Sequence, residues 1–508
     1  MCPDFSPAPS PARPPASPPE TPPAAHHADP LADPLGSPLG TPPGTQLSRQ
    51  RWDIYCRVVD NLGDVGVCWR LASALSGCGQ EVHLVIDDPS ALQWLAAGAT
   101  AEVQVHRWPG PDELGDVVIE AFGCSLPQAV LQALAKRVAQ QQPQAVPMAE
   151  SRQQPAPAPA PAPAPGTSPT FPTSTAAAPD AAPGTAPATA PAPGDLPIWL
   201  NLEHLSAEPY VEASHGLLSP QREGPPKWFF YPGFSRRTGG LLREPDLQAR
   251  QRSFDRLAWL QSQGLQLRPH EKLVSLFCYA NDHLPALLAS LADTAQGGGP
   301  TLLLATAALP VAVRQMLSAA ALKHPALRVH GLPLLSQIDF DHLLWASELN
   351  VVRGEDSLVR ALWAARPFIW QAYVQRDQAH HAKVLALLDW LDGLDRLDAR
   401  PEAPEAPAAH VRVHAKPDPA RTPAPLNHQQ AALQQMASVW RAWNGLPGCP
   451  WPGLPGRHDV LGWQTWRDSS LLRRDLMQQP SDLLGRLLAF VASRQQRPEQ
   501  QTVPAANA

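Results

Sequence analysis

Short apolar runs alternate with helix-spaced segments in the first ordered part of the chain. We expect strands at 52–59, 81–86, 117–122 and 197–202, and a helix at 67–75, where apolar residues recur at helical spacing. Strands that alternate with helices form a parallel sheet with helices on both of its faces. The pattern therefore predicts a Rossmann-like α/β domain.

The same alternation starts again further along the chain. The residues from 229 to 244 carry Tyr-Pro-Gly-Phe and Thr-Gly-Gly, which predict an irregular connection. After it we expect strands at 273–277, 301–305, 327–330, 349–352 and 367–370. Two successive halves of this kind predict an α/β fold in which two Rossmann-like domains face a cleft.

Proline-rich stretches interrupt this pattern. The chain has 508 residues, of which 62 are proline. Segments with few aromatic and β-branched residues cannot offset the entropy lost on ordering, so we expect them to be disordered. They are a tail at 1–50, insertions at about 140–195 and about 398–425, and a second tail at 491–508. We expect the Pro-Ala alternation within the first insertion to be a passive linker, with a docking arm as the alternative.

The interruptions set the predicted domain boundaries. We expect an N-terminal domain at 51–240 and a C-terminal domain at 241–490, with the last helices packing back on the N-terminal domain.

Charge and composition exclude several classes of function. The net charge is −6 and there is no basic block, which disfavours nucleic-acid binding. No apolar run reaches the roughly 18 residues of a membrane span, and the N-terminus does not resemble a signal peptide, so we expect a cytoplasmic protein. The seven cysteines form no C-x-x-C pair and indicate buried free thiols. No metal-ligand spacing occurs among the histidines, and we expect no metal.

The first candidate motif is Asp60-Asn61-Leu62-Gly63-Asp64-Val65-Gly66, between the first strand and the first helix. Ligands of open α/β sheets bind at the carboxyl ends of strands, where this loop lies. The spacing is not G-x-G-x-x-G, so a nicotinamide or flavin site is not favoured. Two carboxylates then point to the cleft. The alternative is structural: Asp64 caps the helix and Asp60 closes its own turn.

The second motif is Arg353-Gly354-Glu355-Asp356-Ser357, between a strand and a helix that we expect to start near Ser357. A helix N-terminus binds anions through its free N–H groups and its dipole. A diphosphate fits there, with Arg353 as a helper; the alternative is that Asp356 or Ser357 caps the helix. One such loop in each domain is the layout of a nucleotide-sugar transferase.

Several long motifs carry a family resemblance. They are the runs at 52–72, 118–124, 201–208, 231–234, 238–244, 276–279 and 343–360. In these the chain resembles the EarP family of bacterial protein-arginine rhamnosyltransferases, which mature elongation factor P. The resemblance covers about 52–135, 197–395 and 430–490, and leaves out the N-terminal tail and the two insertions.

The resemblance implies an inverting transferase of GT-B architecture. Members of this family move L-rhamnose from dTDP-β-L-rhamnose, held by the C-terminal domain, to one arginine of elongation factor P, without a metal. Two alternatives stay open. One is another GT-B enzyme that acts on a glycan or lipid. The other is a Pro-rich scaffold with a degenerate nucleotide-binding fold.

The resemblance also assigns roles to the carboxylates. A guanidinium stays protonated and is a poor nucleophile, but a carboxylate can orient it and accept its proton. By similarity Asp64 is the base, Asp60 orients the acceptor or shapes the loop, and Glu355 positions the guanidinium or the sugar. The departing diphosphate meets the backbone N–H groups around Asp356 and Ser357.

Donor contacts are implied residue by residue. Gln337 matches a glutamine that reads the thymine, and Leu334 stands where a phenylalanine is expected against the base. The full set of implied donor-binding residues is Phe234, Tyr279, Leu334, Gln337, Phe340, Arg353, Glu355, Asp356, Ser357 and Tyr373.

Overall fold

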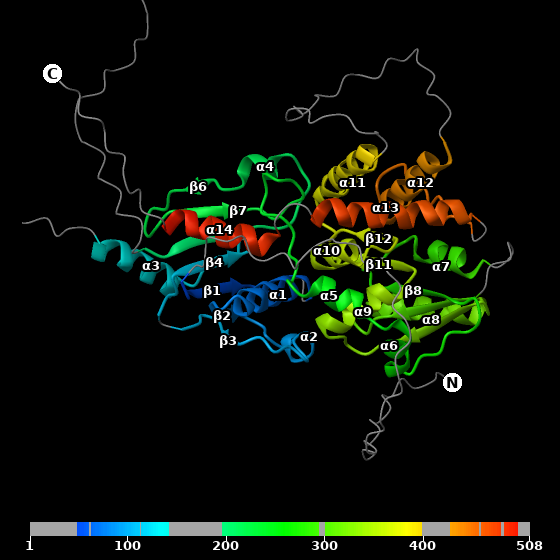
Figure 1. Ribbon diagram of the computed structural model, residues 1–508, viewed down its shortest axis with the longest axis horizontal. Helices are drawn as coiled ribbons and strands as arrows, with labels where there is room; N and C mark the ends of the chain where they lie inside the picture. The colour runs from blue at the N-terminus through cyan, green and yellow to red at the C-terminus, as the bar shows by residue number, and fades with distance from the viewer. Residues whose placement is uncertain are drawn as a thin grey trace, which may run out of the picture. The chain divides into compact units, whose positions relative to one another are not determined.

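The fold is taken from a computed structural model, shown in Figure 1. It describes residues 48–59, 62–111, 113–141, 196–293, 300–398, 427–456, 459–478 and 482–495. The predicted disordered tails and insertions lie almost wholly outside these residues. One of their predicted limits is wrong, because residues 491–495 belong to a helix, α14 (Leu483–Gln495), rather than to a tail.

The first sheet has seven strands in the order β3-β2-β1-β4-β5-β7-β6. They are β1 (Arg51–Cys56), β2 (Glu81–Ile86), β3 (Val103–Arg107), β4 (Val117–Ala121), β5 (Ile198–Leu202), β6 (Leu218–Ser219) and β7 (Lys227–Phe230). Neighbouring strands are parallel except β6 and β7. The four predicted strands of this half are confirmed as β1, β2, β4 and β5, with ends that differ by up to three residues. Strands β3, β6 and β7 were not predicted, and β7 takes residues 229 and 230 from the segment expected to be irregular.

The second sheet has five strands in the order β10-β9-β8-β11-β12, all parallel. They are β8 (Lys272–Leu276), β9 (Thr301–Ala305), β10 (Leu327–Gly331), β11 (Leu349–Arg353) and β12 (Phe368–Gln371). All five predicted strands of this half are confirmed. Strands β9 and β11 read as nearly continuous apolar runs because helices cover both faces of a parallel sheet.

Helices connect the strands and cover the sheets. They are α1 (Gly63–Gly77), α2 (Leu92–Leu95), α3 (Gln128–Gln141), α4 (Tyr210–Ser214), α5 (Leu247–Arg252), α6 (Arg256–Ser262), α7 (Leu284–Ala292), α8 (Val311–Lys323), α9 (Gln337–Ala346), α10 (Gly354–Ala364), α11 (Ala379–Asp398), α12 (His428–Trp443), α13 (Val460–Gln478) and α14. Of the helices in the described residues, none is long and apolar enough to cross a membrane.

Both sheets share one strand order. If the strands are numbered from the start of each half, both sheets contain the order 3-2-1-4-5. The direction in which successive strands are added therefore reverses between β1 and β4 in the first sheet and between β8 and β11 in the second. Ligands of doubly wound sheets bind outside the carboxyl ends of the strands at these switch points. The predicted fold class, α/β with two Rossmann-like domains in the GT-B layout, is confirmed.

The last described helix belongs to the core of the first sheet. Leu487 and Val491 of α14 are fully buried in the same cluster as Ile54 of β1. Phe490 packs edge-on against Trp228, with ring centroids 5.8 Å apart. Helix α13 instead buries Trp466 in the core of the second sheet. The C-terminal end of the chain therefore contributes to both cores.

Six of the seven cysteines lie in the described residues, all as free thiols. The interior of the two halves holds four of them, Cys56, Cys68, Cys124 and Cys278. The prediction of buried thiols is wrong for the other two, because Cys78 is exposed and Cys449 is half-buried.

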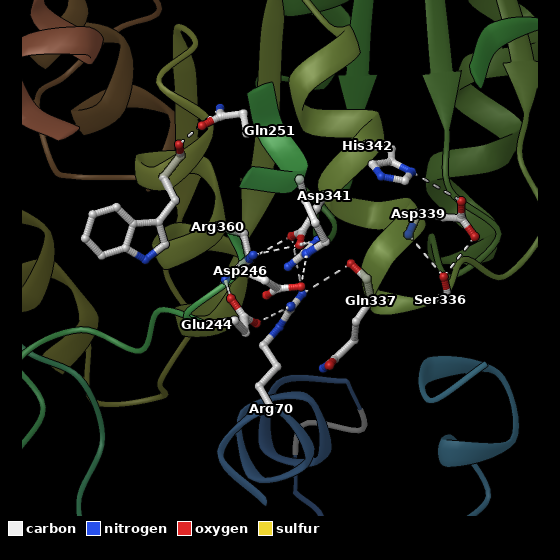
Figure 2. Close-up of polar contacts among 12 residues, drawn as sticks. Arg70, Glu244, Asp246, Gln251, Ser336, Gln337, Asp339, Asp341, His342 and Arg360 are labelled. Carbon is white, nitrogen blue, oxygen red and sulfur yellow. Dashed lines mark hydrogen bonds and ion pairs between the residues drawn. The ribbon is translucent and has the colours of Figure 1, made fainter. Parts of the chain in front are cut away.

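A buried ionic network joins the two halves (Figure 2). Arg70 of α1 reaches Glu244 at 2.8 Å and Asp341 of α9 at 3.5 Å. Arg360 of α10 holds Asp341 through two hydrogen bonds of 2.7 and 2.6 Å and holds Glu244 through one of 2.6 Å. The side chains of Asp341 and Arg360 are only 1% exposed.

The network is balanced in charge. Apart from the exposed Asp246, which pairs with Arg250, it contains three arginines and three carboxylates: Arg70, Arg250, Arg360, Glu244, Asp341 and Asp356. Burial by itself raises the pKa of Glu244, but the charges of Arg360 and Arg70 lower it far below its usual range. Burial likewise opposes the charge of Arg360, whose pKa is nevertheless raised by Asp341 and Glu244. Glu244 and Arg360 therefore stay ionised in the interior.

Removal of one cation from this network should be costly. We expect Arg360→Met to lower the free energy of unfolding by about 3–5 kcal/mol, because Asp341 and Glu244 lose their main buried partner. Urea denaturation followed by circular dichroism measures the change. Arg222→Met, at an exposed position, is the matched control and should change stability by less than about 0.5 kcal/mol. Equal stabilities of the two variants would show that the network contributes no net stability.

Candidate active site

Two adjoining cavities lie at the switch points of the two sheets. The larger cavity, of about 440 Å³, is lined by residues of both halves, among them Asp64, Phe122, Glu355 and Tyr373. The narrow cavity, of about 60 Å³, is lined by many of the predicted donor residues: Leu334, Gln337, Phe340, Arg353, Glu355, Asp356 and Ser357. Gly63, Glu355 and Asp356 line both cavities. The site therefore has two compartments that meet at the start of α10.

Asp64 lies in the first turn of α1 and faces the larger cavity. Its Oδ2 accepts a hydrogen bond from the N–H of Val59 at 2.8 Å, so it folds the preceding loop back on the helix. The helix begins at Gly63, and no side chain caps it at Leu62, so the capping alternative for Asp64 is wrong. The positive end of the helix dipole favours a carboxylate here. Asp60 lies outside the described residues, and its role stays a prediction.

Helix α10 begins three residues earlier than predicted. It starts at Gly354, and Arg353 stands at the N-cap position without a side-chain hydrogen bond to the helix. The alternative that Asp356 or Ser357 caps it is therefore wrong. Gly354 has φ = 72°, in the left-handed region that favours glycine, which explains the sharp turn from β11 into the helix. The free N–H groups of the first turn now belong to Gly354, Glu355 and Asp356.

Glu355 is held from three sides. Its Oε1 lies 2.5 Å from the Nζ of Lys383 on α11. Its Oε2 accepts the N–H of Leu205 at 2.8 Å and lies 3.5 Å from the Nδ1 of His204. Burial alone raises the pKa of Glu355, but Lys383 and His204 together lower it to about 2. Glu355 is therefore a fixed anion at neutral pH and a poor proton acceptor.

The contact with Glu355 also changes the pKa of His204. Burial alone lowers the pKa of His204, but the Glu355 carboxylate raises it above the usual value. Its ring stacks on Phe122 with centroids 4.7 Å apart. Phe122 follows β4, so His204 joins the switch point of the first sheet to the start of α10.

Asp356 has the opposite environment. It lies 3.3 Å from the Nε of Arg70, but burial and the nearby acids Asp341 and Glu244 raise its pKa. Helix α1 comes close at this point because Gly66 has no side chain: a Cβ there would lie 3.3 Å from Oδ2 of Asp356. The carbonyl of Gly66 accepts a 2.8 Å hydrogen bond from Nε2 of Gln337. The two halves thus touch through residues of both cavities.

Arg353 is clamped between two aromatic rings. Its guanidinium lies 4.4 Å from the ring centre of Phe277 and 4.3 Å from that of Tyr279. It also donates to the carbonyl of Cys278 at 3.3 Å. Tyr279 lines neither cavity but meets Tyr373 edge-on, with centroids 5.7 Å apart. These contacts keep Arg353 directed at the narrow cavity.

One predicted donor residue lies elsewhere. Phe234 packs against Trp390, with ring centroids 4.7 Å apart, and lines a separate small cavity with Trp363 and Arg486. The prediction that Phe234 faces the nucleotide is not supported by this position. Phe234 instead packs against the core of the second sheet.

The sequence missed several residues of the site. His204, Lys383 and Arg70 hold its carboxylates, and Thr306 lines the narrow cavity with a buried hydroxyl that has no hydrogen-bond partner in the described residues. His204 lies in the motif 201–208 that carries the family resemblance, but the sequence by itself assigned it no function. Lys383 belongs to an ordinary amphipathic helix, and nothing in its local sequence marks it. Among the described residues there is also no group of three or more His, Cys, Asp or Glu side chains that could hold a metal.

The architecture and the site together define a class. Two doubly wound domains meet at their switch points, with a carboxylate of one half facing a helix N-terminus of the other. This is the arrangement of a GT-B glycosyltransferase. The chain belongs to the EarP family, whose model is described as "Elongation-Factor P (EF-P) rhamnosyltransferase EarP" and matches residues 52–146 and 180–446.

Two relatives are named for the activity of this family. A protein-arginine rhamnosyltransferase of Pseudomonas aeruginosa is 35% identical over 84% of this chain and 96% of its own length. A protein-arginine rhamnosyltransferase of Pseudomonas putida is 39% identical over 66% of this chain and 80% of its own. A solved structure described as "Structural basis for EarP-mediated arginine glycosylation of translation elongation factor EF-P" is 25% identical over 88% of this chain and 99% of that chain, with a TM-score of 0.45.

The lowered pKa of Glu355 predicts a dependence of stability on pH. Its folded pKa of about 2 lies below the ordinary value of 4.5, so its contribution is present above about pH 4.5 and is lost as the pH falls towards 2. We expect Glu355→Gln to remove on the order of 2–3 kcal/mol at pH 7 and to flatten the decline of stability on acidification.

Urea denaturation between pH 7 and pH 3 measures this dependence. Glu223→Gln, at an exposed glutamate, is the matched control and should follow the wild-type curve. A Glu355→Gln variant with the wild-type acid dependence would contradict the ion-pair account.

Proposed function

We propose that this protein transfers L-rhamnose from dTDP-β-L-rhamnose to an arginine side chain of translation elongation factor P, in the cytoplasm and with inversion at the sugar carbon. The family and the names of its relatives support this activity. The observation that carries the mechanism is that Asp64 and Glu355, from different halves, line one cavity beside the start of α10.

The narrow cavity suits the donor nucleotide. Leu334 is 47% exposed and, with Phe340, offers an apolar wall on which a thymine ring can pack. Gln337 would exchange its bond to Gly66 for the polar edge of the base, and the unpartnered hydroxyl of Thr306 offers a further hydrogen bond. Replacement of the expected phenylalanine by Leu334 exchanges ring stacking for aliphatic packing.

The diphosphate would lie at the start of α10. The N–H groups of Gly354, Glu355 and Asp356 and the helix dipole stabilise the negative charge that develops as the sugar leaves. Arg353, clamped beside the narrow cavity, adds a fixed positive charge. Ser357, which lines the same cavity, supplies a hydroxyl. These groups supply the charge stabilisation without a metal, and we propose that none takes part.

The larger cavity suits the acceptor arginine. Its volume of about 440 Å³ exceeds that of an arginine side chain and leaves room for the sugar ring. One guanidinium nitrogen attacks the anomeric carbon as the bond from that carbon to the diphosphate oxygen breaks. The nitrogen then loses a proton, which passes to Asp64. Glu355, ionised and fixed, orients the guanidinium but does not take the proton.

The activity can be tested directly by mass. We expect elongation factor P incubated with this protein and dTDP-β-L-rhamnose to gain the mass of one deoxyhexose, mapped to an arginine by peptide fragmentation. UDP- and GDP-sugars serve as controls and should give no product. A product with one of these donors, or on a glycan or lipid in place of the protein, would replace this proposal with a different GT-B activity.

The catalytic role proposed for Asp64 can be tested separately from its hydrogen bond to the loop. Asp64→Asn keeps an oxygen for the N–H of Val59 but removes the base, so we expect kcat to fall by at least about 100-fold while binding of dTDP is unchanged. Asp87→Asn is a matched control, because Asp87 holds the N–H of the neighbouring Val58 at 2.9 Å from an exposed position. We expect near wild-type turnover in the control. Wild-type turnover by Asp64→Asn would exclude Asp64 as the base.

A further inference from the structure

The two oxygens of Glu355 are held in different ways. Oε2 has a backbone partner, the N–H of Leu205 at 2.8 Å, and lies beside His204, which is itself stacked on Phe122. Both partners belong to the first half, and one of them is a backbone group. Oε1 is paired only with Lys383 among the described residues. One oxygen is therefore anchored and the other is held by a single flexible side chain.

Lys383 is suited to move. Its side chain is 22% exposed, and Glu355 is its one ion-pair partner in the described part of the chain. It lines the larger cavity, so free space adjoins its side chain. A lysine is a compact charge on a long flexible stem, and it can leave one partner for solvent at low cost. The segment at 373–378, just before α11, is exposed, and Tyr373 and Gln375 of this segment line the same cavity.

A buried carboxylate also requires a cation. The side chain of Glu355 is 22% exposed, so it is largely withdrawn from water, and a cation beside it offsets that desolvation. An empty site must therefore supply its own positive charge. A substrate guanidinium would supply another, and the ammonium group of Lys383 and the guanidinium would repel one another at one carboxylate. Exchange of one cation for the other keeps the charge of the site constant.

We propose that Lys383 is a placeholder for the acceptor: it occupies Oε1 of Glu355 while the site is empty, and the acceptor guanidinium replaces it there on binding. Lys383 is then a positioning residue that acts through Glu355. This inference rests on the proposed function, because it requires a guanidinium as the acceptor. His204 and the N–H of Leu205 stay on Oε2 and keep Glu355 ionised and oriented during the exchange.

If this exchange occurs, two substitutions of Lys383 should change the KM for the acceptor protein in opposite directions. Lys383→Met removes the competing cation, so we expect the KM for the acceptor protein to fall about 3- to 10-fold, with kcat within about 3-fold of wild type. Lys383→Arg replaces a point charge with a group that can bind Glu355 through two hydrogen bonds, so we expect the KM to rise. A merely structural lysine would predict damage by Met and rescue by Arg.

Steady-state kinetics with full-length protein, dTDP-β-L-rhamnose and elongation factor P test the proposal. Lys323→Met, which removes an exposed lysine at the end of α8, is the matched control and should leave both constants unchanged. Thermal unfolding of the acceptor-free variants gives a second readout, in which Lys383→Met should be less stable than the control.

The outcomes separate this inference from the proposed function. No product from the wild-type protein would overturn the proposed function itself. Product from the wild type together with an unchanged or higher KM in Lys383→Met would overturn the placeholder and leave the function standing. A lower KM in Lys383→Met and a higher one in Lys383→Arg would support it.

Discussion

The buried ion pairs of Arg70 are the interaction on which the rest of the site depends. Arg70 extends from the first helix of one half into the acids of the other, at 2.8 Å from Glu244 and 3.3 Å from Asp356. Such pairs form only when both helices lie close together, and Gly66 permits that approach. Once they form, the loop after β1 and the start of α10 face one another across the two cavities. The network thus sets the geometry within which every other group of the site acts.

Two adjacent carboxylates on α10 show how the surroundings divide chemical roles. Glu355 meets Lys383 and His204, which lower its pKa to about 2. Asp356, one residue later, is buried beside further acids, and its pKa is raised. One is a permanent anion on the side of the larger cavity, while the other belongs to the ionic network. With a pKa of about 2, Glu355 is a poor acceptor for a guanidinium proton, and Asp356 is engaged by Arg70 at 3.3 Å. The proposed mechanism therefore gives that role to Asp64.

The division into two cavities matches a reaction between two different substrates. Charged side chains of both signs line both cavities, but the lining of the narrow cavity is largely apolar, with aromatic and aliphatic side chains on which a nucleobase can pack. They meet at the N–H groups of the first turn of α10, where the bond to the leaving diphosphate would break. A placeholder lysine fits this arrangement, because a site built to receive a cation must balance its own charge when empty.

Much of the fold followed from local patterns. Strands of both halves were predicted within a few residues because parallel strands are buried on both faces and read as apolar runs, and the two carboxylate loops follow directly from their place after β1 and β11. The start of α10 was predicted wrongly because a positive φ at Gly354 begins the helix before any capping side chain. Phe234, the partners of Glu355 and the arginines of the network depend on contacts between residues 19 or more positions apart in the chain, such as Phe234 with Trp390 and Arg360 with Asp341. The local pattern therefore determined which helices and strands form and which loops carry the functional carboxylates. Tertiary packing alone decided which charges meet, since an ion pair is selected by distance in space and leaves no periodic trace in the sequence.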